Sequence, residues 1–232
     1  MTANIKRRTV SVLMTAALLL ASLPVLVFAS ANSTFTDVKT GDWFYDDVMW
    51  AYGKGYVKGC GSDSYEPQSR LTEAAMLTIL YRVAGEPEFE NKVDFGDQFE
   101  TVDGEFAHAK ASWFYTAFCW AGTLGIIDAG TSTAACRRLV GCNASPLSRA
   151  ALAKMIGDYV KVFNVRLPDK HEFKGLQDIK EGAWYYSDAV SLYKAGIMMG
   201  VSETSFAPDK PTTRAEAAAV IRRLSDAAPN IA

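Results

Sequence analysis

Two stretches near the C-terminal end of the chain place apolar side chains at helical spacing. The first stretch contains Tyr186, Ala189, Val190, Tyr193 and Ile197. The second contains Ala217, Val220, Ile221 and Leu224. A period of about 3.6 residues puts each set on one helix face, so both predict amphipathic helices packed on a core. Gly196, Gly200 and Pro208 lie between them and predict a loop, so we interpret this segment as a helix–loop–helix unit.

The second helix is expected to begin within the sequence Thr213-Arg214-Ala215-Glu216. Thr213 and Glu216 can satisfy each other's backbone N–H groups as a capping box. Capping does not explain Arg214, because a cation in the first helical turn opposes the helix dipole. Together with free N–H groups at the same helix end, Arg214 predicts a site for a carboxylate or phosphate. An ordinary surface arginine is the alternative interpretation.

A third apolar stretch, residues 10–29, follows three basic residues at 6–8 and ends in small residues at 29–31. This layout predicts a secretory signal peptide over residues 1–31 and therefore a secreted protein. A retained membrane anchor is the alternative, because about 18 apolar residues can span a bilayer. Pro24 and the Ala-x-Ala ending favour cleavage.

The composition is that of an ordinary globular chain of 232 residues, 49% of them hydrophobic. There are 24 basic and 26 acidic residues, for a net charge of -2. Loss of the three leader cations would leave the mature chain at about -5. A general nucleic-acid binder needs a basic face to replace phosphate counterions, so we expect no nucleic-acid partner. An anionic ligand would instead be held by a few placed cations.

An internal repeat organises the rest of the chain. A shift of 141 residues aligns residues 35–85 with 176–226 without a gap. Identical pairs include Asp37 and Asp178, Trp43 and Trp184, Tyr45 and Tyr186, Gly59 and Gly200, Pro67 and Pro208, and Thr72 and Thr213. The predicted units are residues 32–90, 91–165 and 172–228.

The middle unit is a looser copy with expanded loops. Trp113 follows Trp43 by 70 residues, and Gly125 follows Gly55 by the same interval. After six extra residues, Ser148-Arg149-Ala150 matches Thr72-Glu73-Ala74. The start of this unit is best matched at residues 95–97.

Along these units the order is Phe-x-Asp-Val, Trp-Phe-Tyr, two glycines, aromatic-x-Pro and Thr-Arg-Ala-Glu, although no single unit carries every element. This order resembles the S-layer homology (SLH) module, from residue 35 to about residue 228. The resemblance implies an all-α, mainly helical fold in which three helix–loop–helix modules form a pseudo-trimeric spindle. It also implies a non-catalytic module that anchors a protein at the cell wall or cell surface. Its partner would be an anionic, pyruvylated secondary cell wall polymer, a peptidoglycan-linked polysaccharide, bound in the grooves between modules.

The resemblance also carries the family's ligand-binding positions onto this sequence. They are the early Asp, the Trp, the loop glycines and the Arg of Thr-Arg-Ala-Glu. In the third unit these are Asp178, Trp184, Gly200 and Arg214; in the second, Asp97, Trp113 and Arg149; in the first, Asp37, Trp43 and Gly59. The Trp would stack on a sugar ring, the Arg would bind the carboxylate and the Asp would accept hydroxyl hydrogen bonds. A core position is the alternative for each Trp.

The first unit departs from the family pattern at the Arg position. Glu73 occupies the Arg position there, and its carboxylate suits the helix dipole but would repel an anionic sugar. Arg70 lies nearby in sequence and is a candidate substitute. The first and second units also lack the capping Glu, since they have Ala75 and Ala151. We therefore infer that at most two of three grooves keep the anion-binding chemistry.

Four cysteines in an exported chain permit disulfides. Cys136 and Cys142 lie in the expanded stretch of the second unit and are the first candidate pair, which leaves Cys60 and Cys119; three connectivities are open. We expect no metal and no cofactor, because no Cys-x-x-Cys pair exists and neither histidine lies at ligand spacing from a cysteine pair.

Two other functions compete with wall anchoring. A cell-wall hydrolase is disfavoured because the sequence has no nucleophile elbow, no His-Glu-x-x-His motif and no phosphate loop. A mechanism based on paired carboxylates stays open, since carboxylates distant in sequence can meet in space. Alternatively, degenerate grooves bind a surface protein partner instead of a polymer.

Overall fold

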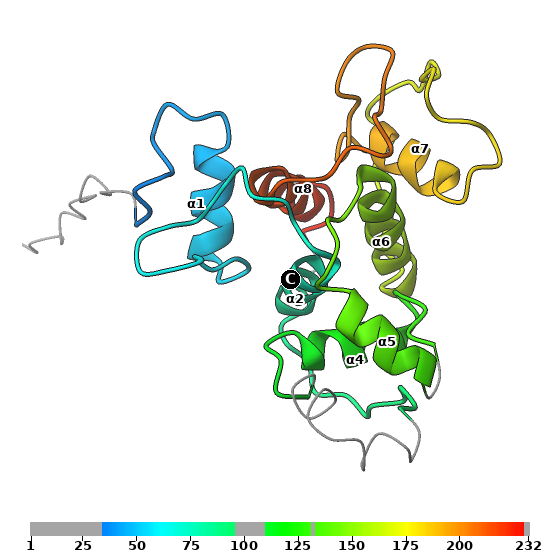
Figure 1. The fold of residues 1–232 in the computed structure, drawn as a ribbon. Coiled ribbons are helices and arrows are strands. Elements are labelled where there is room, and N and C mark those ends of the chain that lie inside the picture. The colour runs from blue at the N-terminus through cyan, green and yellow to red at the C-terminus, as the bar shows by residue number, and fades with distance from the viewer. Residues whose placement is uncertain (1–33, 96–109, 131–132, 230–232) are drawn as a thin grey trace, which may run out of the picture. The chain divides into compact units, whose positions relative to one another are not determined.

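Helices form the regular elements of the part of the chain that the structure, a computed structural model, describes: residues 34–95, 110–130 and 133–229. Within these residues there are seven helices and no strands, which confirms the mainly helical prediction. They are α1 (Tyr45–Gly53), α2 (Glu73–Val83), α4 (Tyr115–Leu124), α5 (Thr133–Gly141), α6 (Arg149–Val162), α7 (Tyr186–Lys194) and α8 (Arg214–Ala227) (Figure 1). The predicted signal peptide lies outside the described residues.

The repeat appears as three helix pairs: α1 with α2, α4 with α6, and α7 with α8. Helix α5 occupies the expanded stretch of the second unit. The predicted stripe on α8 is confirmed, because Ala217, Val220, Ile221 and Leu224 are all buried. On the other stripe, Ile197 lies past the end of α7 but is still fully buried, since the chain turns inward at Gly196, whose φ is +76°.

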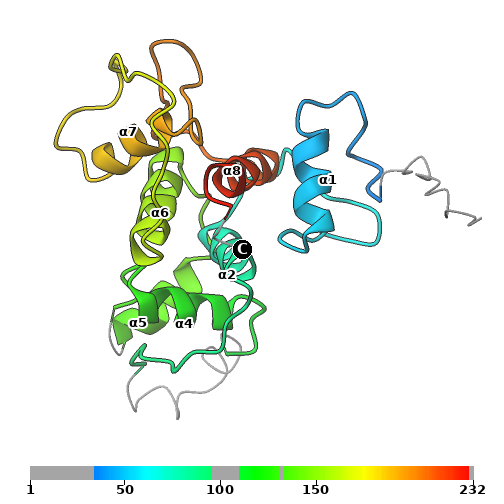
Figure 2. The same cartoon turned by 180° about the vertical axis from the view of Figure 1, so that it is seen from behind.

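The first helix of each unit packs on the second helix of a different unit. Helix α1 contacts α8, α4 contacts α2, and α7 contacts α6. Figures 1 and 2 show the long helices α2, α6 and α8 next to one another, each with its shorter partner on the outside. The units are therefore interleaved in a cycle, and one hydrophobic core extends through all three.

A ring of three backbone hydrogen bonds joins the units. The Leu71 N–H donates to the Thr212 carbonyl at 2.8 Å, the Thr212 N–H to the Leu147 carbonyl at 2.8 Å, and the Leu147 N–H to the Leu71 carbonyl at 2.7 Å. All three residues are buried. Buried backbone groups need partners, so this ring satisfies three donors and three acceptors across unit boundaries.

Each ring residue directly precedes the N-cap of a long helix. The caps are Thr72, Ser148 and Thr213, and each hydroxyl accepts a hydrogen bond from the backbone N–H three residues later. The predicted capping box between Thr213 and Glu216 is confirmed, with both of its hydrogen bonds formed. The other two helices keep only the hydroxyl half, as Ala75 and Ala151 require.

Further N–H groups at these helix ends donate to carbonyls of another unit. Ala215 donates to Pro67 at 2.9 Å, Ala150 to Pro208 at 2.9 Å, and Ala74 to Cys142 at 3.0 Å. The orphan donors of a helix start are thus partly used to fasten one unit to the next.

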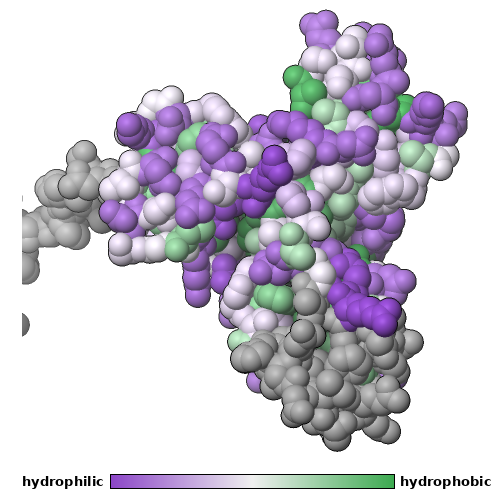
Figure 3. All heavy atoms as spheres, in the orientation of Figure 1, coloured by the Kyte–Doolittle hydropathy of each residue, from purple (hydrophilic) through white to green (hydrophobic). Residues whose placement is uncertain are grey.

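The described surface is mostly polar on the face shown in Figure 3, where hydrophobic side chains form small areas. None of the described helices combines the length and apolar character needed to cross a bilayer.

One buried polar group is left unsatisfied beside the ring. Within the described residues, the Thr212 hydroxyl has no hydrogen-bond partner, and the two equivalent ring positions are leucines. We predict that Thr212→Val raises the free energy of unfolding by about 1 kcal/mol, because a buried hydroxyl without a partner is destabilising. Chemical denaturation measures the change. The control Thr213→Val removes the cap and should lower stability by about 1 kcal/mol; a loss of stability in Thr212→Val would contradict the prediction.

Candidate functional site

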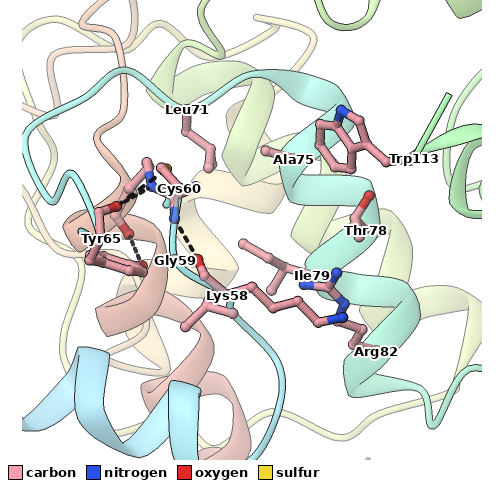
Figure 4. A pocket seen from close by; sticks show the side chains of 12 residues that line it. Lys58, Gly59, Cys60, Tyr65, Leu71, Ala75, Thr78, Ile79, Arg82 and Trp113 are labelled. Carbon is pink, nitrogen blue, oxygen red and sulfur yellow. Dashed lines mark hydrogen bonds between the residues drawn. The ribbon is translucent and has the colours of Figure 1, made fainter. Parts of the chain in front are cut away.

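Three grooves lie between the units, and each draws residues from all three of them. Groove 1 is formed by the loop 57–60 and helix α2 of the first unit, with Trp113 of the second unit and Arg214 of the third. Its cavity volume is about 580 Å³. Figure 4 shows Trp113 beside Ala75 and Thr78 on α2, with Arg82 further along the same helix.

The other two grooves repeat this plan by rotation through the units. Groove 2 has the segment 126–128 and α6 of the second unit, Glu73 of the first and Trp184 of the third. Groove 3 has the segment 198–201 and α8 of the third unit, Arg149 of the second and Trp43 of the first. Their cavity volumes are about 540 Å³ and 590 Å³. Three sites of similar size and construction thus follow from the repeat.

One exposed tryptophan lines each groove. Trp43, Trp113 and Trp184 are 60–62% exposed, so none of them is a core residue. Each directly precedes the N-cap aromatic of its helix, and its ring meets that aromatic ring nearly at right angles at 5.2–5.3 Å. The neighbouring ring therefore holds each indole at the groove while leaving much of its surface open to solvent.

Arg149 and Arg214 line grooves 3 and 1 and also connect units. The Arg149 Nε and Nη2 donate to the carbonyls of Phe206 and Met199 at 2.8 and 2.7 Å. In the same way Arg214 donates to Tyr65 and Lys58, at 2.8 Å each. Each guanidinium also lies over an aromatic ring, Phe206 or Tyr65, at 4.9 or 4.6 Å from its centre. A first-turn arginine is thus fixed by the loop of the next unit.

The predicted ligand aspartates support the loops. Asp37 accepts hydrogen bonds from the backbone N–H groups of Tyr65 and Glu66 and from the Ser64 hydroxyl. Asp178 does the same with Phe206, Ala207 and Ser205. Glu66 and Ala207 have φ values of 56° and 55°, a conformation that these bonds hold in place. Neither aspartate is among the residues that line grooves 1 and 3.

Both aspartates have a pKa below the ordinary value of 3.8. Partial burial acts to raise the pKa, but the hydrogen bonds that each carboxylate accepts outweigh it. The charged form is therefore favoured in the folded chain.

The two loop glycines line their grooves for a steric reason. A Cβ at Gly59 would lie 2.7 Å from the Ser64 carbonyl oxygen, and one at Gly200 would lie 2.4 Å from that of Ser202. Only glycine allows the loop to fold back this tightly.

The structure pairs the predicted residues across units. Arg149 shares groove 3 with Trp43 and Gly200, whereas Arg214 shares groove 1 with Trp113 and Gly59. Trp184 lines groove 2, where the Arg position is Glu73. Asp97 lies outside the described residues.

Sequence reasoning missed several cations that line the grooves. Groove 1 also contains Lys58 and Arg82, and groove 3 contains Lys210 and Arg223. Arg82 and Arg223 occupy the same helical position, nine residues after the first residue of α2 and α8. The 141-residue repeat matches them as well, so the alignment contained this signal.

In groove 2, helix α5 supplies the cation that pairs with Glu73, the residue at the family's Arg position. Arg138 of α5 forms a two-pronged ion pair with the Glu73 carboxylate. That hydrogen bond raises the pKa of Arg138, in spite of its partial burial. The cation that neutralises Glu73 therefore comes from the expanded stretch of the second unit, while the nearby Arg70 is not among the groove-lining residues.

The predicted disulfide between Cys136 and Cys142 is wrong for this structure. Cys142 is a free, buried thiol whose Sγ donates to the Leu139 carbonyl at 3.0 Å, and burial raises its pKa to about 12. The Cys136 side chain lies outside the described part. Cys60 and Cys119 are also free, the first exposed and the second buried. Among the described residues, no group of His, Cys, Asp and Glu could hold a metal ion.

Two segments of the chain match a known family model, the S-layer homology domain. Residues 34–77 and 177–218 carry S-layer homology domains. These segments contain the loop and the start of the second helix in the first and third units. The predicted resemblance is confirmed for those two units.

The chain is also similar to longer proteins. It is 26% identical over 205 residues to an amylopullulanase from Thermoanaerobacterium thermosulfurigenes, which covers 86% of this chain and 10% of that protein. It is 26% identical over 199 residues to an S-layer protein from Bacillus thuringiensis subsp. finitimus, with 84% and 22% covered. A surface layer protein from Brevibacillus choshinensis is 40% identical over 57 residues, 25% of this chain and 5% of that one. The chain thus spans less than a quarter of the length of these relatives.

The loop aspartates predict a pH dependence of stability. Their pKa values are lowered on folding, so their contribution is present above the unfolded value near 3.8 and is lost as pH falls through the lower folded pKa. We expect the free energy of unfolding to decrease between about pH 5 and about pH 2. In the double variant Asp37→Asn with Asp178→Asn this decrease should be smaller. Urea denaturation at several pH values measures it, with exposed Glu203→Gln as the control that should follow the parent; an unchanged slope in the double variant contradicts this role.

Proposed function

We propose that this chain is a non-catalytic anchoring module that binds an anionic secondary cell wall polymer in grooves 1 and 3. The observation that carries the proposal is the composition of those grooves. Groove 1 combines an exposed Trp with three cationic side chains, and its described lining contains no acidic one. Groove 3 also has three cations, and its single carboxylate, Glu216, is paired with Lys210 at 2.7 Å.

The chemistry of these grooves fits an acidic saccharide. An exposed indole offers a flat apolar face for a sugar ring, and Arg82 or Arg223 can bind a carboxylate on that sugar. Arg149 and Arg214 keep the local potential positive while their Nε and Nη2 atoms hold loop carbonyls. A partly water-excluded groove strengthens such charge attraction relative to an open surface.

The proposal extends to the second unit and to the location of the protein. We infer that residues 91–165 form a third module of the same type, supported by the groove that they build with the other two units. We further propose that the protein is secreted and held at the cell wall or cell surface, with no catalytic role for the described residues. Similarity to an S-layer protein and to a surface layer protein supports this placement.

The tryptophans give the sharpest test, because they are exposed and their removal should leave the core intact. We predict that Trp43→Ala with Trp113→Ala lowers binding to purified cell walls by roughly tenfold, since each stacked ring is worth about 0.5–1.5 kcal/mol. A sedimentation assay measures the bound fraction against wall concentration. The comparison variant is Trp184→Ala, which alters groove 2 alone and should lower binding less than the double variant does.

A second arm identifies the ligand. Walls from which the secondary polymer has been removed chemically should no longer bind the parent chain, and Arg149→Ala with Arg214→Ala should bind intact walls weakly. Full binding to stripped walls would overturn the proposal in favour of a protein or peptidoglycan partner. Solubilisation of the walls by the chain would overturn its non-catalytic part.

A further inference from the structure

The charge pattern of groove 2 is reversed relative to groove 1 at three equivalent positions. Lys58 of groove 1 corresponds to Asp128 of groove 2 by the same 70-residue shift that relates Trp43 to Trp113. Both residues lie on the loop that lines their groove. The loop cation of groove 1 is therefore a loop carboxylate in groove 2.

The other two reversals come from helices. The first helical residue that enters the groove is Arg214 in groove 1 and Glu73 in groove 2. The residue nine positions along the groove's own helix is Arg82 in groove 1 and Asp158 in groove 2. Glu73 and Asp158 belong to different units, yet both line groove 2. The changes are thus gathered by groove and not by unit, as expected if they serve one ligand.

Two cations that groove 1 lacks pair with two of these three carboxylates. Arg138 pairs with Glu73 through both carboxylate oxygens. Lys154, which replaces Thr78 at the same helical position, pairs with Asp158, and Lys161 approaches the other Asp158 oxygen at 3.3 Å. Asp128 accepts a hydrogen bond from the Gly130 N–H at 2.9 Å. The described lining of groove 2 therefore has three carboxylates and two cations in place of an excess of cations. Glu73 and Asp158 are ion-paired, and Asp128 is held by a backbone N–H.

We propose that groove 2 binds an uncharged saccharide, so that the chain recognises two chemically different sugars. An anionic sugar would meet three carboxylates and lose the attraction present in grooves 1 and 3. An ammonium group would compete with Arg138 and Lys154 for Glu73 and Asp158, which are already paired, and with the Gly130 N–H for Asp128. Sugar hydroxyls can donate to these carboxylates and accept from the two cations without breaking either pair. Trp184, which is 62% exposed, supplies the ring face.

This inference rests on the proposed saccharide-binding function and divides it between grooves. The three exposed tryptophans allow each groove to be observed separately. In a 15N-labelled full chain, the indole N–H signals of Trp43, Trp113 and Trp184 report grooves 3, 1 and 2, with assignments from single Trp→Phe variants. The probes are an N-acetylhexosamine disaccharide and the same disaccharide carrying a pyruvate ketal.

The expected result is a division of the signals. At the signals of Trp43 and Trp113, the pyruvylated probe should give a Kd at least tenfold lower than the uncharged probe gives. At the signal of Trp184, the uncharged probe should give the lower Kd, by the same factor. Added salt should weaken the first interaction and leave the second nearly unchanged, because only the first depends on net charge. A Trp184 signal that follows the pyruvylated probe equally well, that follows neither probe, or that prefers a de-N-acetylated amine overturns the inference. If the pyruvylated probe leaves the signals of Trp43 and Trp113 unchanged, that result instead contradicts the proposed function.

A variant that transfers the reversal to groove 1 provides the complementary test. Lys58→Asp with Arg82→Asp should weaken the response of Trp113 to the pyruvylated probe at least tenfold, while the response of Trp43 persists. The matched control is Lys39→Asp with Lys180→Asp, which makes the same change in net charge at exposed positions outside the grooves. If both double variants reduce the Trp113 response alike, net charge and not groove chemistry determines selectivity, and the inference is wrong.

Discussion

The ring of backbone hydrogen bonds through Leu71, Leu147 and Thr212 is the constraint on which the rest of the structure depends. Each of its bonds crosses a boundary between units, and each of its residues directly precedes the cap of a long helix. The ring therefore fixes where α2, α6 and α8 begin relative to one another. Residues 73, 149 and 214 directly follow these caps. The ring therefore also sets which groove each of these first-turn side chains lines. Three grooves exist because three helix starts are held around one set of bonds.

The residues that make the grooves suitable for binding are the same residues that hold the units together. Arg149 and Arg214 donate to loop carbonyls of the next unit, and Asp37 and Asp178 fix the turns that present those loops. A cation at a helix start is unfavourable on its own, and here the carbonyl dipoles of the neighbouring loop offset that cost. This arrangement keeps the cations in place before any ligand arrives, which reduces the entropy lost on binding.

The sequence predicted local structure well because local structure depends on period, caps and turn residues. The stripe on α8 and the capping box of Thr213 follow from such signals. The grouping of Trp43 with Arg149 did not follow from them, since helical periodicity says nothing about which unit a helix will pack against. The disulfide prediction was wrong for a similar reason. It rested on the short separation of Cys136 and Cys142 in the sequence, whereas packing buries the Cys142 thiol in the core. The cations at positions 82 and 223 were visible in the repeat alignment but gained a role only from the groove.

Beside groove 2, the backbone bonds that join the units are kept while the side chains that line the groove differ. At each long helix start the second N–H donates to a carbonyl of another unit, and this holds for Ala74 even though its partner is Cys142 and not a proline. Helix α5 thus replaces the loop of the other units while conserving the backbone bond that the scaffold needs. With that bond preserved, Arg138 can neutralise Glu73 from outside the repeat pattern, and the side chains that face the groove can change without loss of the fold. A cyclic scaffold built on backbone bonds leaves each groove free to acquire its own selectivity, because the ring constrains main-chain atoms and not the charges around them.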